Sequence, residues 1–399
     1  MDTVFEALVR ENDKKIVLLV MDGLGGLSLT PDGKTELETA MTPNLDRLLA
    51  RSECGLHLPL GIGITPGSAP GHLGLFGYDP FKYPIGRGVV AATGIGFPLK
   101  AGDVAVRLNF ATADEKGNII DRRAGRIPTE KCAELSKLLD GMKIEDIEVF
   151  VRPVKDYRAC VIFRGPGLSD EVADTDTQKT EVPPLDPEPL STKATKTARI
   201  AKAFVSEALQ RLKDKKPANA ILLRGFAELP HIPSLKERFK LKPVALAVYP
   251  DYKGVSRLVG MDVIEDLPEL SAQLKALSQV WGQYNFFFIH HKYTDSKGED
   301  GDFKAKVAEI EKVDSAIPAI LDLKPDVLLV TGDHSTPALL KAHSCHPIPF
   351  LIAAQAVRPS GLSKFSEREC LRGAWNMIRS QELIRLAMAY ADKVQKFGA

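Results

Sequence analysis

The chain has 399 residues, two to three times the usual domain length of ~100–200 residues, which predicts two domains. Hydrophobic residues make up 44% and charged residues 26%, so the composition excludes a disordered or collagen-like protein. Lysine and arginine total 53 against 52 aspartate and glutamate residues, without a long block of one sign, which argues against a nucleic-acid partner or binding to a membrane surface.

The N-terminal segment mixes acidic and basic residues and lacks the apolar stretch of a secretory signal. Apolar runs elsewhere are far shorter than the ~20 residues of a membrane-spanning helix. The five cysteines are widely spaced and form no C-x-x-C pair, a pattern typical of reduced thiols. We therefore expect a cytoplasmic protein with no membrane contact. The number of subunits stays open between a monomer and a homo-oligomer.

The first strong strand signal covers residues 15–23, a continuous apolar run that is typical of a central parallel strand covered on both faces. Residues 42–52 predict a helix with Thr42 as its N-cap and Pro43 at its first position. Residues 61–80 are so rich in glycine and proline that we expect mostly constrained loop. Strand followed by helix indicates an α/β fold.

From residue 89 to residue 256 the strand candidates become shorter and a proline-rich polar loop separates them. We interpret this part as an inserted, smaller α/β domain that binds the substrate, and residues 1–88 and 257–399 as the core. The last third resumes the first pattern. Its predicted elements are strands at 285–291, 326–334 and 350–355, a helix at 303–321 interrupted by Pro318, and a closing helix at 369–394.

Metal-ligand residue types follow three of the predicted core strands. The carboxyl ends of parallel strands are where α/β sheets hold such ligands. A single aspartate in this position is more often a turn former or helix cap, but for the whole set we favour one shared site. The candidates are Asp22 after the first strand, Asp333 and His334 after another, His290, His291, Lys292, Asp295 and Glu299 along a third, and His343 and His346 on a nearby loop.

Ser68 lies in the glycine-rich loop, where we expect the N-terminus of a helix. Free backbone N–H groups and the helix dipole favour an anion there. A serine hydroxyl next to a metal ion becomes a nucleophile at neutral pH. The alternative is that Ser68 is only an N-cap. His72, one turn later, either lines the same site or packs on its helix.

The chain resembles the alkaline-phosphatase superfamily, and most closely the cofactor-independent phosphoglycerate mutases of the archaeal type. The resemblance covers nearly the whole chain and implies an alkaline-phosphatase-like core with a largely parallel sheet between helices. The motifs that carry it are, in chain order, MDGLGG, TPGSAPGHLGLFGYDP, GRGVVAATGIG, DRRAGRI, LLRG, KGVSRLVGM, TDSKGEDGD and TGDHSTP followed by HSCHPIP.

The resemblance implies two divalent cations and no 2,3-bisphosphoglycerate. The first cation would be held by Asp22, Ser68, Asp333 and His334, and the second by Asp295, His343 and the residue at position 299. The family normally has histidine there, whereas this chain has Glu299. More oxygen ligands favour Mn²⁺ or Mg²⁺ over zinc, with Co²⁺ as a further candidate.

The implied substrate, phosphoglycerate, is a small anion that suits guanidinium forks. The residues expected to bind it are Asp121, Arg122, Arg123, Arg126, Arg224 and His72. Lys292 would act in catalysis by neutralising the transferred phosphoryl group. For each arginine a solvated surface position is the alternative.

The implied reaction is the interconversion of 3-phosphoglycerate and 2-phosphoglycerate through a phosphoserine at Ser68, a step of glycolysis and gluconeogenesis. One alternative is a metal-dependent phosphatase, sulfatase-like hydrolase or phosphomutase on the same core. Another is a metal-binding protein that has lost turnover.

Overall fold

The computed structural model describes residues 2–398 and divides the chain into a larger unit, Met1–Tyr83 with Ile232–Ala399, and a smaller unit, Pro84–His231. The expected insert ran from 89 to 256, so the two divisions differ mainly at the second limit. The reason is strand β9 (Pro243–Ala247), which pairs in parallel with β11 (Phe286–His291) of the larger unit. A short apolar run does not indicate which sheet it joins.

The larger unit contains an eight-stranded sheet in the order β10-β9-β11-β1-β12-β13-β2-β14. Only the two pairs made by β13 are antiparallel, which confirms the expected largely parallel sheet. Besides β9 and β11, its strands are β1 (Ile16–Met21), β2 (Glu53–Leu58), β10 (Asp262–Val263), β12 (Val327–Thr331), β13 (Ile348–Ala354) and β14 (Met377–Arg379).

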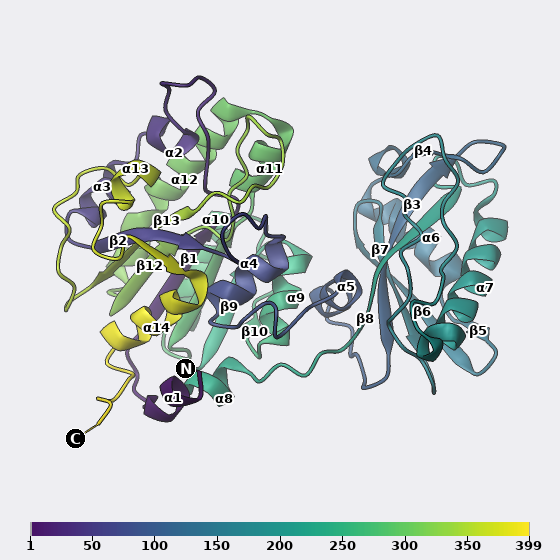
Figure 1. The fold of residues 1–399 in the computed structure, drawn as a ribbon, viewed down its shortest axis with the longest axis horizontal. Helices are drawn as coiled ribbons and strands as arrows, with labels where there is room; N and C mark the ends of the chain where they lie inside the picture. Colours follow the sequence, from purple (N-terminus) through teal and green to yellow (C-terminus); the bar gives the residue numbers. More distant parts are fainter. Residues whose placement is uncertain (1, 399) are drawn as a thin grey trace. The chain divides into compact units, whose positions relative to one another are not determined.

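Helices cover both faces of this sheet, with α2, α3 and α12 on one side and α4, α9 and α14 on the other (Figure 1). Strand β1 is buried along its whole length, as its unbroken apolar sequence requires. The helices of the larger unit are α1 (Asp2–Leu8), α2 (Glu36–Thr39), α3 (Pro43–Leu49), α4 (Ser68–Leu75), α8 (Leu235–Phe239), α9 (Pro250–Leu258), α10 (Leu270–Val280), α11 (Tyr293–Asp300), α12 (Phe303–Asp322), α13 (Glu367–Cys370) and α14 (Ser380–Tyr390).

Helix α12 runs through Pro318 without the expected interruption. A proline inside a helix leaves the carbonyl four residues earlier without its usual partner. That carbonyl belongs to Asp314, and the Asn44 side chain donates a hydrogen bond to it at 3.1 Å. The Asp314 carboxylate also accepts from the backbone N–H of Leu45, at the start of α3. Tertiary contacts therefore supply what the proline removes.

The expected closing helix is wrong in its first half, because helix α13 ends at Cys370 and the chain then forms the edge strand β14 before α14 begins. Between the helices the chain lies against β2. A Cβ on Gly373 would come within 2.2 Å of the Cys54 carbonyl oxygen, and Trp375 Nε1 donates to Glu53 at 2.7 Å. These contacts favour a close approach to the sheet over a continuous helix.

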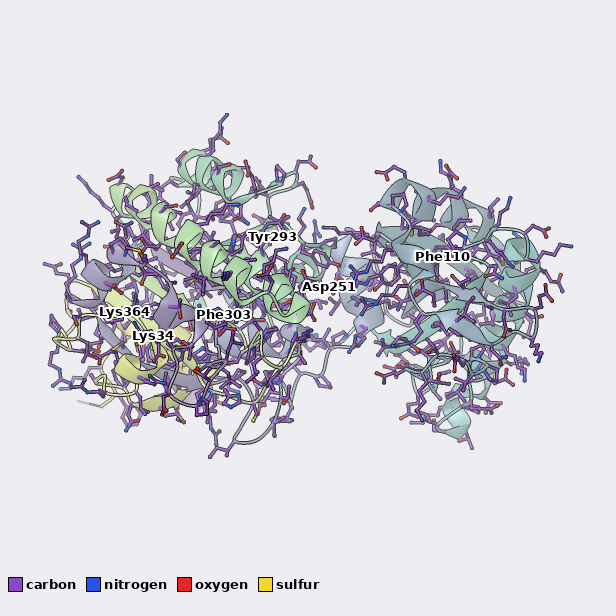
Figure 2. The ribbon with its side chains drawn as sticks, turned by 90° about the horizontal axis from the view of Figure 1, so that it is seen from above. Lys34, Phe110, Asp251, Tyr293, Phe303 and Lys364 are labelled. Carbon is purple, nitrogen blue, oxygen red and sulfur yellow. The ribbon has the colours of Figure 1, made fainter. Side chains whose placement is uncertain are left out.

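The smaller unit is built on a six-stranded antiparallel sheet. One face is apolar and packs on α6 and α7; Phe110, labelled in Figure 2, belongs to that core. The other face carries helix α5. Its elements are α5 (Arg87–Gly94), β3 (Val104–Ala113), β4 (Ile119–Asp121), α6 (Thr129–Leu139), β5 (Met142–Ile144), β6 (Ile147–Lys155), β7 (Arg158–Arg164), α7 (Thr195–Leu212) and β8 (Ala220–Glu228), with short 3₁₀ turns at Ala124–Arg126 and Thr192–Ala194.

Among residues 2–398, no helix combines the length and the apolar character needed to cross a bilayer.

Candidate functional site

Three neighbouring parallel strands bring the expected metal ligands to one edge of the large sheet. The order is β11-β1-β12, and Met21 at the end of β1 lies opposite His291 at the end of β11. Asp22 follows β1 directly, Asp333 comes two residues after β12, and Asp295 lies in the first turn of α11 after β11. The sheet therefore places at one edge three carboxylates that are far apart in the sequence.

The first cluster centres on the Nε2 atom of His334. Oδ1 of Asp22 and Oδ2 of Asp333 each lie 3.2 Å from it, and the Ser68 Oγ lies 3.3 Å from it. Asp22, Asp333 and His334 have no exposed surface, and neither of the two carboxylate oxygens has a hydrogen-bond partner among the described residues. Buried carboxylate oxygens that accept no hydrogen bond are costly unless a cation neutralises them. The donor set therefore fits a divalent metal ion.

In this cluster, burial and charged neighbours act on the pKa values in opposite directions, and the neighbours prevail. Burial opposes ionisation of Asp22, but Lys292, His334 and His290 together hold its pKa well below the ordinary value. Burial also opposes protonation of His334, yet Asp333 and Asp22 raise its pKa to about 9. The carboxylates thus draw a proton onto His334, and a metal ion binding there would release that proton.

The second cluster joins Asp295 and His343. Their Oδ1 and Nε2 atoms are 3.5 Å apart, and the His343 ring stacks on His334 with centroids 3.7 Å apart. Glu299 lies at the rim, with Oε1 3.9 Å from His343 Nε2 and a side chain 55% exposed. Lys292 Nζ contacts Asp295 and lies 3.0 Å from Asp22 Oδ2, so its ammonium group bridges the two clusters. All seven expected ligands thus lie around one site.

Local backbone geometry explains how Ser68 reaches this site. It is the first residue of α4, with Gly67 as the N-cap, which confirms the expected helix N-terminus. A Cβ on Gly71 would lie 2.6 Å from the Asp333 carbonyl oxygen, so only glycine lets α4 pack this closely. The serine hydroxyl and the free N–H groups of the first turn therefore face the same point.

His72, which was expected to bind substrate, lies beside the first cluster, with Nδ1 3.2 Å from Asp333 Oδ2. Its side chain has no exposed surface and packs among Phe76, Phe288 and Tyr252. Its Nδ1 lies 2.8 Å from the Ser68 carbonyl oxygen, so we assign it the N–H that donates there. These contacts fit the packing alternative, in which His72 stabilises the backbone at Ser68.

Two other histidines among the candidate ligands contact residues outside the two clusters. His291 Nε2 lies 2.9 Å from Glu309, and His346 Nδ1 lies 2.9 Å from the Ser344 hydroxyl.

Tyr252 is a site residue that sequence reasoning missed. It is buried on α9, and its hydroxyl donates to Oδ2 of Asp22. Its ring stacks on His290 with centroids 3.7 Å apart. The adjoining motif at 253–261 carries the family resemblance but suggested no role for this tyrosine. Nothing in the local sequence indicates which carboxylate the hydroxyl would reach.

Two of the candidate arginines of the smaller unit, Arg122 and Arg224, approach Asp176. Arg122 donates to both carboxylate oxygens, at 2.9 and 2.7 Å, and Arg224 lies 3.4 Å from one of them. Burial raises the pKa of Asp176, but Arg122 and the other donors lower it below the ordinary value overall. Arg107 on β3, which the sequence did not single out, lies opposite Arg224 on β8.

The remaining residues of the predicted substrate motif have other positions. Asp121 accepts from the backbone N–H groups of Arg123 and Gly125, so its carboxylate closes a turn. Arg123 and Arg126 are exposed.

Comparison with known proteins gives a consistent result. Residues 50–219 match a family model described as 2,3-bisphosphoglycerate-independent phosphoglycerate mutase. The chain is 47% identical to a protein from Aquifex aeolicus, over 100% of both chains, and 48% identical to a protein from Thermus thermophilus, over 99% of both. Both proteins are named probable 2,3-bisphosphoglycerate-independent phosphoglycerate mutase.

Solved structures resemble the chain over similar lengths. A protein from Pyrococcus horikoshii has a TM-score of 0.83 at 29% identity, covering 97% of this chain and 100% of that one. A cofactor-independent phosphoglycerate mutase from Thermoplasma acidophilum has a TM-score of 0.70 at 29% identity, covering 95% and 100%.

Proposed function

The chain belongs to the 2,3-bisphosphoglycerate-independent phosphoglycerate mutase family, and we propose that it interconverts 3-phosphoglycerate and 2-phosphoglycerate through a phosphoserine at Ser68. The observation that supports this most is the position of the Ser68 hydroxyl. It lies at a helix N-terminus, 3.3 Å from His334 Nε2 and beside two buried carboxylates. A hydroxyl in such surroundings is suited to attack a phosphoryl group.

We assign one divalent cation to Asp22, Ser68, Asp333 and His334, and a second to Asp295, Glu299 and His343. The oxygen-rich donor sets suit Mn²⁺ or Mg²⁺, with Co²⁺ as a further candidate. Such a cation, when bound, acts as a Lewis acid that lowers the pKa of the serine hydroxyl and neutralises phosphoryl charge.

The chain's own residues account for the rest of the transfer. The Ser68 hydroxyl loses its proton and its oxygen forms a bond to phosphorus, while the bond from phosphorus to the glycerate oxygen breaks; the glycerate oxygen keeps the electron pair and takes up a proton. The other glycerate hydroxyl then loses its proton and attacks the phosphoserine, and the released Ser68 oxygen takes up a proton. Lys292, with a side chain 15% exposed, offers a positive charge to the phosphoryl oxygens. These two transfers require no bisphosphoglycerate.

We assign recognition of the substrate's anionic groups to the smaller unit. Arg122 and Arg224 approach the same carboxylate of Asp176, and Arg107 lies beside Arg224 in the sheet. Planar guanidinium groups held side by side suit a ligand that carries both a carboxylate and a phosphate.

The reaction belongs to glycolysis and gluconeogenesis, and we assign the enzyme to the cytoplasm. Sedimentation of the purified chain would decide between a monomer and a homo-oligomer.

The test is a coupled enolase assay with 3-phosphoglycerate and Mn²⁺, together with a measurement of released phosphate. We expect isomerisation with little phosphate release. Ser68→Ala should lose at least ~10³-fold in kcat, because the nucleophile is gone. Ser278→Ala, at an exposed position on α10, is the matched control and should retain activity.

Turnover retained by Ser68→Ala would refute the nucleophile. Phosphate released as fast as substrate is consumed would favour the phosphatase alternative. A wild-type chain that binds Mn²⁺ but turns over neither way would favour a metal-binding protein.

A further inference from the structure

Lys306 is a lysine on α12 whose side chain has no exposed surface. Helix α12 begins at Phe303, labelled in Figure 2, shortly after α11, which begins at Tyr293. The Lys306 ammonium donates three hydrogen bonds to backbone carbonyls: Gly23 at 2.9 Å, Gly25 at 3.0 Å and Thr336 at 2.8 Å. An ammonium group has three N–H donors, so all of them are used on backbone.

The three carbonyls belong to the two loops that carry the first metal cluster. Gly23 comes directly after Asp22, and Thr336 comes two residues after His334. The backbone N–H of Thr336 also points to this loop, 3.3 Å from the Gly23 oxygen and 3.1 Å from the Gly25 oxygen. One side chain from a third segment thus ties the β1 loop to the β12 loop.

Thr336 extends this link to the second cluster. Its hydroxyl donates to Oδ1 of Asp295 at 2.7 Å and lies 2.9 Å from Nδ1 of His334. A Cβ on Gly298 would come within 2.1 Å of the Thr336 carbonyl oxygen, so helix α11 rests against the same peptide group. Any displacement of that group would move ligands of both clusters.

Burying the Lys306 ammonium group costs desolvation free energy, which the packing of the side chain does not offset. Burial lowers the pKa of Lys306, and the carboxylate of Glu36, whose negative charge opposes this, lies 3.9 Å from the ammonium nitrogen. Glu36 itself accepts from the backbone N–H groups of Leu27 and Ala338, which extend the same two loops. A methionine would fill similar space without the desolvation penalty. The gain from lysine lies in the carbonyls that it holds.

We propose that Lys306 is a positioning residue that holds both metal-binding loops in place, so that one buried ammonium group controls the affinity of both cation sites. The proposal rests on the proposed function only in that the two clusters bind divalent cations. Residues that orient metal ligands typically contribute ~10–100-fold to metal affinity.

The experiment is calorimetric titration of Mn²⁺ into metal-free, full-length protein, comparing wild type with Lys306→Met. We expect both binding steps to weaken by at least ~10-fold, and added Mn²⁺ to restore part of kcat. The matched control is Lys393→Met. Lys393 is also buried and donates to a backbone carbonyl, that of Asn12 at 2.7 Å, but it contacts neither metal loop.

A second variant guards against unfolding, because Lys306→Met leaves the buried Glu36 carboxylate without a nearby cation. Lys306→Met/Glu36→Gln removes that charge, and the amide oxygen can still accept one of the two backbone hydrogen bonds, from Leu27 or from Ala338. We expect this protein to recover thermal stability and still to bind Mn²⁺ weakly. Unchanged Mn²⁺ affinity in either folded variant, or weakening at only one site, would overturn the proposal. Weak Mn²⁺ binding by these variants, combined with a wild type that lacks mutase activity, would refute the proposed function alone.

Discussion

The Tyr252 hydroxyl donates a hydrogen bond to Oδ2 of Asp22, the carboxylate oxygen that also lies 3.0 Å from Lys292 Nζ. The other oxygen, Oδ1, lies 3.2 Å from His334 Nε2 and has no hydrogen-bond partner among the described residues. The carboxylate is therefore fixed on one side and available on the other. Such an arrangement orients a single oxygen toward a cation.

Tyr252→Phe should weaken Mn²⁺ binding by ~10-fold while leaving the fold intact, because only the hydroxyl is removed. The buried ring can keep its stacking on His290. Tyr284→Phe is the control, since Tyr284 also donates to a carboxylate, Asp262 at 2.9 Å, at an exposed position. Calorimetry with Mn²⁺ makes the comparison. Equal affinities in the two variants would show that the hydroxyl does not orient Asp22.

Arg122→Lys should raise the KM for 3-phosphoglycerate by at least ~10-fold with a smaller effect on kcat, because lysine cannot form the guanidinium fork. Arg199→Lys is the matched control, because Arg199 donates a similar bidentate pair of hydrogen bonds to Glu145, at 2.9 and 2.8 Å, on the exposed surface. Initial rates in the coupled assay give both constants. A KM that stays at the wild-type value would remove Arg122 from the substrate site.

The clustering of the candidate ligands could be predicted from the sequence because it depends on two local features. Buried parallel strands give unbroken apolar runs, and their carboxyl ends meet at one edge, so ligand-type residues just after such runs gather together. Asp22 and Asp333 follow this rule, and Ser68 follows the preference of helix N-termini for anion-binding groups. The roles of these residues stay predictions until they are measured.

The supporting residues could not be predicted, because each acts through a contact between distant segments. Tyr252 reaches Asp22 across 230 positions of sequence, and Lys306 reaches Gly23 across 283. Arg107 lies opposite Arg224 only because β3 pairs with β8, and the local sequence does not reveal that pairing. Composition and periodicity report burial, but they do not report which buried polar groups meet.

We expect Glu367 to make the free energy of unfolding depend on pH. Its carboxyl group accepts from the backbone N–H of Gly26 and the hydroxyl of Thr35, so it helps to hold the loop after β1. Burial raises its pKa to about 7 from an ordinary value of 4.5, against the effect of those hydrogen bonds. The folded state therefore binds this proton more tightly than the unfolded state does. Stability from this group is fully present below pH 4.5 and is lost as the pH rises through about 7.

The expected loss between pH 5 and pH 8 is on the order of 2 kcal/mol, and Glu367→Gln should abolish it. Urea unfolding of metal-free protein measures the effect. Both tryptophans, Trp281 and Trp375, lie in the larger unit, so their fluorescence reports on the unit that contains Glu367. Glu369→Gln, on the same helix, is the control and should keep the wild-type slope. An equal slope in Glu367→Gln and the wild type would show that this carboxyl group is ionised in the folded protein throughout the range.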